Sequence, residues 1–148
     1  MKISTKGRYG LRAMIDLATY GDENQPIFLS DIAKRQHISD KYLEHIFSAL
    51  QKSGLVRAVR GKKGGYMLTR AAAEITLNEI LNVLEGPCVL VNCVSDSSLC
   101  DRGDLCAARD IWAMLGEKIE EILKGITLAD LAEKQKEKSQ CKALIYQI

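Results

Sequence analysis

Three cysteines in one short segment are the residues of this chain best suited to chemistry. Cys93, Cys100 and Cys106 lie within the acidic stretch CVSDSSLCDRGDLC. Three thiols this close in sequence can converge on one soft metal ion or iron–sulfur cluster, and packing alone rarely calls for them. The segment is therefore predicted to be a sensor that binds a metal or a cluster.

The total cysteine count supports the same interpretation. The chain has five cysteines, the other two being Cys88 and Cys141, and five is an odd number for a disulfide framework. The N-terminal MKISTKGRYG lacks the apolar stretch of a signal peptide, and no window approaches the roughly 20 apolar residues that span a bilayer. We therefore expect a cytoplasmic protein without membrane contact, in which metal or cluster ligation or thiol redox sensing remains open.

The charges are distributed unevenly between the two halves of the chain. Residues 1–70 carry 13 Lys and Arg against 6 Asp and Glu, a net charge of +7, whereas residues 71–148 carry 8 against 13, a net charge of −5. A basic half is attracted to a polyanion, although chance segregation of solvated charges gives the same numbers. With 148 residues, of which 47% are hydrophobic, we expect a single domain or a small domain with an appendage, and a nucleic-acid-binding N-terminal end.

Short capped helices in the basic half predict a helix-turn-helix. Each apolar periodic stretch follows a serine or threonine that can cap it. The expected helices are residues 6–20 after Ser4 or Thr5, residues 31–36 after Ser30, and residues 40–52 after Ser39. The tripeptide His-Ile-Ser is short enough to connect the second helix to the third, as in helix-turn-helix motifs.

The third helix separates an apolar face from a polar one. The apolar positions recur at i, i+3, i+4 and i+7 and are expected in the core: Leu43, Ile46, Phe47 and Leu50. Cations and hydrogen-bond donors occupy the opposite face: Lys41, His45, Ser48 and Lys52. This arrangement suits a helix in the major groove, although an ordinary amphipathic surface helix has the same pattern.

The start of the third helix is where we expect bases to be read. The candidates are Ser39, Lys41, Tyr42 and Glu44. Glu44 is the unusual member, because phosphates repel a carboxylate unless a cytosine amino group donates to it. It is interpreted either as a base selector or as a solvated flanking residue.

A β-hairpin wing is predicted after the third helix. Two β-prone runs, LVRAVR and YMLTR, flank the glycine-rich basic turn GKKGG. The cations that could contact phosphates or a narrow minor groove are Arg57, Arg60, Lys62, Lys63 and Arg70. A nucleotide-binding phosphate loop is the alternative, but the turn lacks the G-x-x-x-x-G-K-[ST] pattern and joins two strands.

The second half is expected to carry a dimerisation helix. Thr76 and Glu79 form a capping box on a helix that stops at Gly86, and residues 88–106 are predicted to be a loop. A long helix is predicted over residues 109–124, with an apolar face at Ile111, Leu115, Ile119 and Ile122. Such a face needs a partner surface, most simply its own copy in a two-fold homodimer, the alternative being that the helix folds back on the N-terminal domain. A short final helix is expected after Thr127.

These residues resemble a known family. The stretches KISTKGRYGLRAMIDLA, SDKYLEHIFSALQKSGLV, RGKKGGYMLTR and ITLADL look like the BadM/Rrf-type winged-helix regulators, and the resemblance covers nearly the whole chain. It implies a mainly α fold with a small β-hairpin wing: a winged helix-turn-helix followed by a long dimerisation helix. The expected divisions are residues 1–86 for DNA binding, 87–108 for the cysteine-rich sensor loop, and 109–148 for the dimerisation helix and tail.

The resemblance also implies a cofactor. In the cluster-binding members, three cysteines precede the dimer helix, and Cys93, Cys100 and Cys106 stand at the matching places. The chain departs from their pattern twice: the first gap holds six residues instead of the usual five, and Arg109 replaces the histidine that serves as fourth ligand. The fourth ligand is then expected from Cys88, from Asp104 or Asp110, or from the other subunit. The resemblance favours a 2Fe-2S cluster over 4Fe-4S.

Alternatives remain for the regulatory signal. Family members that repress cysteine metabolism share the opening MKISTKGRYGL and an apolar C-terminus like ALIYQI, and a partner enzyme of cysteine synthesis controls them. A structural zinc site could use the same thiols. An enzyme is not expected, because neither His37 nor His45 lies near the cysteines in sequence. The sequence therefore predicts a DNA-binding transcriptional repressor that senses iron, cluster or redox status.

Overall fold

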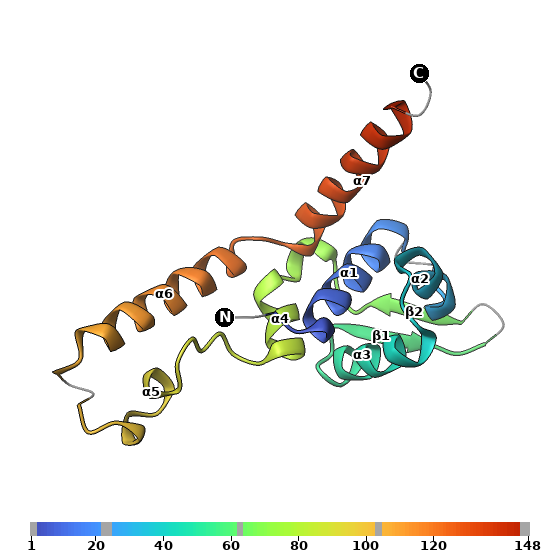
Figure 1. Ribbon diagram of the computed structural model, residues 1–148. Helices are drawn as coiled ribbons and strands as arrows, with labels where there is room; N and C mark the ends of the chain where they lie inside the picture. The colour runs from blue at the N-terminus through green and yellow to red at the C-terminus, as the bar shows by residue number, and fades with distance from the viewer. Residues whose placement is uncertain (1–2, 22–24, 62–63, 103–104, 146–148) are drawn as a thin grey trace.

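The computed structural model describes residues 3–21, 25–61, 64–102 and 105–145 (Figure 1). The N-terminal part contains α1 (Thr5–Tyr20), α2 (Leu29–Gln36) and α3 (Asp40–Lys52). Two of the predicted caps are confirmed: the Ser4 hydroxyl accepts from the Gly7 N–H at 3.1 Å, and the Ser39 hydroxyl accepts from the Tyr42 N–H at 3.4 Å. The helix-turn-helix is confirmed as the local fold.

The start of α2 differs from the prediction. Ser30 was expected as its cap, but the helix begins at Leu29 and its N-cap is Phe28, which makes no side-chain capping hydrogen bond. The preceding residue, Ile27, is fixed instead by exchanging backbone hydrogen bonds with Tyr66 at 3.0 and 2.8 Å. The tertiary bridge therefore determines where the helix begins, in place of the serine. At the other end, His37 takes a left-handed conformation with φ 54° and turns the chain toward α3.

The core lies where α1, α3 and α4 (Leu77–Glu85) meet. Met14 and Leu17 of α1 are at most 1% exposed, and all four predicted core residues of α3 are fully buried. Gly10 permits the close approach of α4, because a Cβ at that position would lie 2.5 Å from Leu84 Cδ1. The apolar periodicity of α3 thus identified its core residues correctly.

The predicted wing is confirmed as an antiparallel hairpin. Strand β1 (Val56–Val59) pairs with β2 (Gly65–Leu68), with Val56 opposite Leu68 and Ala58 opposite Tyr66. The ring of Tyr66 packs edge-on against Phe47 of α3, with centroids 4.8 Å apart. This contact fixes the hairpin beside α3.

An ion pair between a buried carboxylate and a surface arginine joins α1 to α2. Asp16 is 2% exposed, and the guanidinium of Arg35 donates to both of its carboxylate oxygens, at 2.6 to 3.1 Å. Gln36 Nε2 donates to the same carboxylate at 2.8 Å. The hydrogen bonds to Asp16 raise the pKa of Arg35, and the bonds from Arg35 and Gln36 together satisfy the buried carboxylate.

The link from the hairpin to the second half is well capped. A 3₁₀ turn, η1 (Ala72–Glu74), precedes α4, and the Thr76–Glu79 capping box is present in full. The Thr76 N–H and then Arg70 hold the pKa of the Glu79 carboxyl below its usual range. At the far end of α4, the Glu85 carboxylate accepts from the Ser4 N–H at 3.2 and 3.3 Å and from the Ser4 hydroxyl. The end of α4 therefore contacts the start of α1.

The second half is more helical than predicted. The expected loop contains two short pieces, α5 (Asn92–Ser95) and η2 (Ser97–Leu99), before α6 (Ala107–Lys124), which is the predicted long helix begun two residues earlier. The last helix, α7 (Leu128–Ile145), is 18 residues long, so the prediction of a short helix was wrong. The charged residues 134–140 have good helix propensity and continue the helix.

Figure 1 shows α6 and the end of α7 extending away from the N-terminal domain in different directions. The start of α7 packs on α1 and η1, with Leu128 fully buried and Ala132 6% exposed. Over the part of the chain that is described, none of the helices is both long and apolar enough to cross a membrane.

Candidate nucleic-acid interface and cysteine segment

The polar face of α3 is the candidate base-reading surface. Lys41, Glu44, His45 and Ser48 are exposed, while the opposite face of the helix is fully buried. Ser39 is exposed, and its hydroxyl caps the helix. The structure therefore groups these predicted residues on one solvent-facing side of α3, with their backbone fixed by the core.

Tyr42 connects the start of α3 to cations on α1. It is half-buried, and its ring meets the Tyr9 ring edge-on at 6.1 Å. The guanidinium carbons of Arg8 and Arg12 lie 5.7 and 5.5 Å from the centroid of the Tyr9 ring. Sequence reasoning missed this neighbourhood of α1, although the spacing of Arg8 and Arg12 by four residues places both on one helix face.

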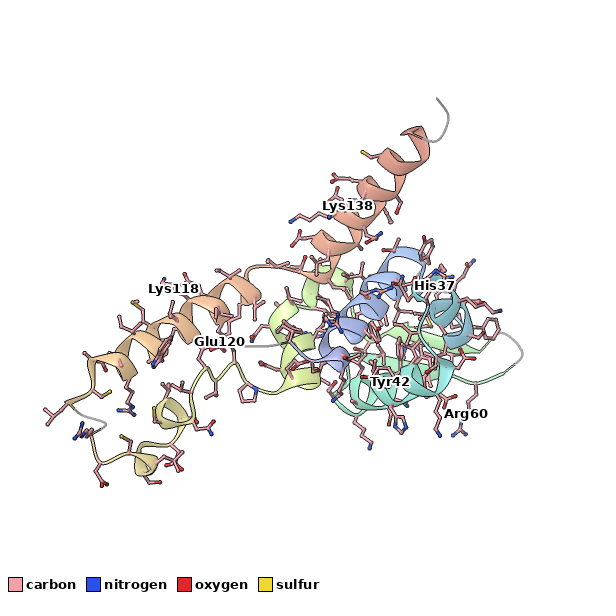
Figure 2. All side chains as sticks on the ribbon, in the orientation of Figure 1. His37, Tyr42, Arg60, Lys118, Glu120 and Lys138 are labelled. Atoms are coloured by element: carbon pink, nitrogen blue, oxygen red, sulfur yellow. The ribbon has the colours of Figure 1, made fainter. Side chains whose placement is uncertain are left out.

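The predicted wing cations fall into two groups. Arg60 follows β1 directly and is exposed at the start of the turn, and Figure 2 shows Arg60 and Tyr42 both toward the lower right of the molecule. Lys62 and Lys63 lie outside the described residues. Arg60 is thus the described cation closest in sequence to the tip of the wing.

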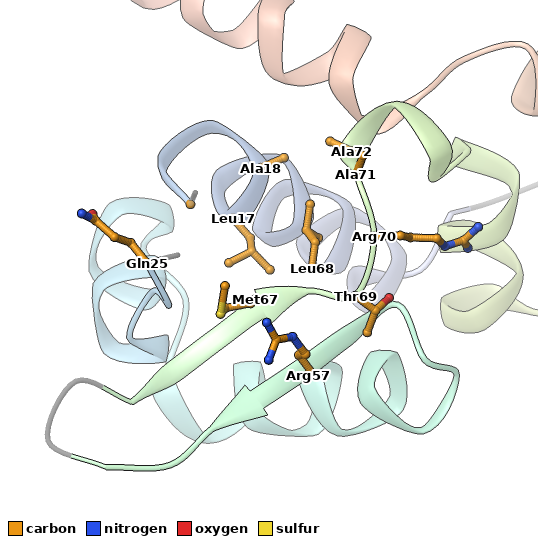
Figure 3. A pocket seen from close by; sticks show the side chains of 11 residues that line it. Leu17, Ala18, Gln25, Arg57, Met67, Leu68, Thr69, Arg70, Ala71 and Ala72 are labelled. Carbon is orange, nitrogen blue, oxygen red and sulfur yellow. The ribbon is translucent and has the colours of Figure 1, made fainter. Parts of the chain in front are cut away.

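Arg57 faces a different surface. It pairs with Met67 across the hairpin, so the two side chains share one face of the ladder, and Tyr66 faces the other side toward Phe47. Figure 3 shows Arg57 at a cavity between the hairpin and the end of α1. The cavity has a volume of about 380 Å³, and Leu17, Ala18, Met67, Thr69 and Arg70 also line it. The hairpin register therefore directs Arg57 away from the polar face of α3.

The three cysteines of the predicted site lie on different pieces of the second half. Cys93 is in α5, Cys100 follows η2, and Cys106 is the N-cap residue of α6. Cys93 and Cys106 are half-buried and Cys100 is exposed, all as free thiols. Among the residues described, no three Cys, His, Asp or Glu side chains are grouped so that they could hold a metal ion. The three thiols lie in one segment of the chain, but they do not converge on a common site.

Cys88 lies beside the middle of α6. Its carbonyl oxygen is 3.5 Å from the position that a Cβ on Gly116 would occupy. Gly116 is ten residues beyond Cys106 in the sequence, which corresponds to roughly 15 Å along a helix. In this conformation Cys88 and Cys106 are therefore too far apart to bind one ion. Cys141, on the exposed part of α7, is also remote in sequence.

Arg109 contacts the segment that its helix follows. Its Nε donates to the carbonyl oxygen of Cys93 at 2.9 Å, and its own N–H donates to the carbonyl of Cys106 at 3.0 Å. Asp110, the neighbouring candidate ligand, is exposed in the first turn of α6. Asp104 lies outside the described residues. Sequence spacing alone could not have shown the contact between Arg109 and Cys93.

The apolar face of α6 is exposed. Although the helix is 18 residues long, none of its side chains is buried. The large hydrophobic residues that remain exposed on it are Ile111, Trp112, Met114, Leu115 and Ile122, and Ile119 is half-buried. Part of α6 packs against α4 of the N-terminal domain, as in the alternative prediction, but this packing leaves the large apolar side chains exposed.

Comparisons with known proteins agree with the geometry. The family model Rrf2, described as an iron-dependent transcriptional regulator, matches residues 3–134. The transcriptional regulator IscR of Serratia proteamaculans is 40% identical over 135 residues, covering 91% of this chain and 81% of its own length. These relatives are transcriptional regulators and not enzymes, as the sequence predicted.

Solved structures resemble the fold over nearly its whole length. CymR, the global cysteine regulator of B. subtilis, has a TM-score of 0.76 at 40% identity, covering 90% of this chain and 98% of its own. The IscR of T. potens has a TM-score of 0.75 at 40% identity, covering 91% and 88%. The winged-helix fold class is thereby confirmed, and the chain belongs to the Rrf2 family of helix-turn-helix transcriptional regulators.

Proposed function

We propose that this chain is a homodimeric, sequence-specific repressor that inserts α3 into the major groove of double-stranded DNA and lays its hairpin wing beside it. The observation that carries the proposal is α3 itself, whose apolar face is fully buried while its donors and cations face solvent. Ser39, Lys41, Tyr42 and Glu44 would read bases, and His45, Ser48, Arg60, Lys62 and Lys63 would contact the backbone. Arg57 would contact DNA from the side of the hairpin that faces the cavity.

The proposed dimer uses the exposed apolar face of α6. A two-fold pairing of this helix with its copy would bury Ile111, Leu115 and Ile119 at one seam. Two copies of α3 related by the same axis would then read a pseudo-palindromic operator. This proposal explains why so large an apolar surface remains exposed on a single chain.

We further propose that an iron–sulfur cluster, 2Fe-2S in preference to 4Fe-4S, regulates the dimer and that Cys93, Cys100 and Cys106 hold it. The donor set fits, because thiolates are the usual ligands of such clusters. Cys106 is half-buried and is the N-cap residue of α6, so its thiol lies where the cysteine segment joins the helix. Bound there, the cluster would supply a redox-active iron centre, and it would order the segment between the DNA-binding domain and α6.

Two other regulatory devices are candidates on specific observations. The likeness to CymR and the apolar C-terminal sequence ALIYQI favour a repressor of cysteine metabolism, controlled by a cysteine-synthesis enzyme as partner. A structural zinc site would use the same three thiols with an oxygen or nitrogen ligand. These alternatives leave the DNA-binding proposal unchanged.

The absorbance spectrum of anaerobically purified protein, combined with iron, sulfide and zinc analysis, tests the cofactor. We expect a brown protein with charge-transfer bands in the visible range and stoichiometric iron and sulfide. A colourless protein containing zinc would establish the zinc site instead. A colourless, metal-free protein whose operator binding responds to an added cysteine-synthesis enzyme would establish the partner-controlled repressor.

Operator selection from a random duplex library, followed by footprinting, tests DNA binding. We expect a two-fold symmetric site and an affinity that falls steeply with salt, because phosphate contacts release counterions. An affinity that does not change with salt would contradict the winged-helix mode of binding.

A further inference from the structure

Arg109 links two of the three thiol-bearing residues. Its side chain reaches back sixteen residues to the Cys93 carbonyl, with Nε 2.9 Å from the oxygen in a partly buried contact. Its backbone N–H bonds the Cys106 carbonyl at 3.0 Å in the first turn of α6. One residue therefore contacts α5 and the start of α6 together.

The hydrogen bonds within the segment itself are local. The Val94 N–H donates to the Val91 carbonyl at 3.1 Å and the Asp96 N–H to Asn92 at 3.0 Å, which closes α5. The Ser98 N–H and hydroxyl donate to the Asp96 carboxylate at 2.9 and 2.6 Å, which shapes η2. These bonds define the two short turns but give them no attachment to α6.

An arginine at this position cannot do what a histidine does. Its guanidinium stays protonated and has no acceptor, so it cannot be a metal ligand. Its planar donors do suit a carbonyl, and a hydrogen bond from a charged donor is stronger than one between neutral groups. The position three residues after the last cysteine is therefore suited to holding backbone instead of metal.

We propose that Arg109 is a positioning residue that holds Cys93 beside the first turn of α6, so that Cys93 and Cys106 keep one arrangement before any metal binds. This inference rests on the proposed cluster function for its biological purpose, although the contact exists in the metal-free chain. Cys100, which is exposed between them, then completes the set of donors. Two of the three ligands are ordered in advance, and the cost of ordering the segment on binding is reduced.

Hydrogen–deuterium exchange of the metal-free protein tests the contact directly. In Arg109→Ala, amides of residues 92–96 should exchange roughly tenfold faster, because α5 loses the side-chain hydrogen bond that holds the Cys93 carbonyl to α6. Arg102→Ala is the matched control, since Arg102 is an exposed arginine of the same segment and should leave exchange unchanged. Unchanged exchange in Arg109→Ala would overturn the proposal. Arg109→Lys keeps the charge and one donor and should show an intermediate rate.

Titration with Co²⁺ under anaerobic conditions, followed by thiolate-to-metal absorption, tests the consequence for binding. The affinity of the three-thiol site should fall about tenfold in Arg109→Ala and less in Arg109→Lys. Equal affinity of the wild-type protein and Arg109→Ala would overturn the positioning role. If the wild-type protein itself shows no thiolate-to-metal absorption while Arg109→Ala still exchanges faster, the proposed cluster function fails and the contact stands. Far-ultraviolet circular dichroism of each variant checks that α6 remains folded.

Discussion

The helices α3 and α6 have similar apolar spacing, but their surroundings differ completely. The four apolar residues of α3 are fully buried by α1, α4 and the hairpin, whereas α6 buries none of its side chains. The apolar face of α3 is therefore covered by other elements of the same chain, whereas the apolar face of α6 is left exposed to solvent. The comparison teaches that the DNA-binding part, together with the start of α7, buries its apolar faces within one chain, whereas α6 is expected to bury its apolar face through assembly.

The largest expected effect is the loss of stability when a core side chain is removed from the DNA-binding part. Phe47→Ala should lower the free energy of unfolding by about 3–5 kcal/mol, because Phe47 is fully buried and packs against Tyr66. Trp112→Ala on exposed α6 is the matched large-to-small change. At protein concentrations that favour the monomer, denaturant unfolding should show little change for Trp112→Ala. Similar losses from both variants would contradict the contrast.

The second prediction concerns the exposed apolar face of α6. Leu115→Glu should weaken dimerisation by a hundredfold or more, about 3 kcal/mol, because it places a charge at an apolar seam. Lys118→Glu, on the charged part of the same helix, serves as the control. Sedimentation should show monomers of the first variant with an intact helical content, and dimers of the second. A dimer that persists in Leu115→Glu would mean that the interface lies elsewhere.

The third prediction separates the cysteines. Cys93→Ala, Cys100→Ala or Cys106→Ala should abolish or severely destabilise the cluster, since a methyl group cannot replace a thiolate. Cys141→Ala should keep the chromophore, and so should Cys88→Ala, because Cys88 lies beside Gly116 and away from Cys106. Visible absorbance after anaerobic purification measures this. Loss of colour in Cys88→Ala would show that the segment rearranges to use it as the fourth ligand.

The fourth prediction concerns base reading by α3. Tyr42→Ala or Glu44→Ala should reduce discrimination between the selected operator and single-base variants by about 1–3 kcal/mol at the affected positions. Fluorescence anisotropy with a panel of duplexes measures it. Uniform weakening on every duplex would assign these residues to the phosphate backbone.

The smallest effect should distinguish the two faces of the wing. Arg60→Ala should weaken binding to all sequences alike and reduce the slope of log affinity against log salt by about one. Arg57→Ala should change that slope less, because Arg57 faces the cavity beside α1. Equal slopes for the two variants would place Arg57 at the DNA backbone as well.

Local signals predicted most of the N-terminal half. Ser4, Ser39 and the Thr76–Glu79 box cap helices as expected, because a cap and the apolar period that follows it lie within a few residues of one another. Ser30 failed because the bridge between Ile27 and Tyr66, which is set by the distant hairpin, fixes the chain just before α2. The length of α7 was missed because a charged run was interpreted as an end, although its residues favour a helix.

The sequence predicted which residues belong to the candidate site, but it did not predict which way all of their side chains point. The helical period of α3 placed its polar residues correctly, because the buried residues on the opposite face belong to the same helix. The direction of Arg57 depends on the strand register and on α1, and the bond from Arg109 to Cys93 spans sixteen residues with no periodic signal. The sequence predicted that the three thiols would meet, whereas among the described residues no three Cys, His, Asp or Glu side chains are grouped so that they could hold a metal ion.

The hydrogen bonds between Glu85 and Ser4 hold the end of α4, where the chain leaves the DNA-binding domain, against the start of α1. Gly86, with φ 86° and ψ −177°, follows Glu85 immediately and leads through Pro87 to Cys88. A pull on the cysteine segment would therefore act next to a carboxylate that accepts hydrogen bonds from the residue that caps α1. If a cluster or a partner displaces that segment, the displacement would reach α1, whose Tyr9 contacts Tyr42 of α3, and it would also reach α3 through the direct contacts of α3 with α4.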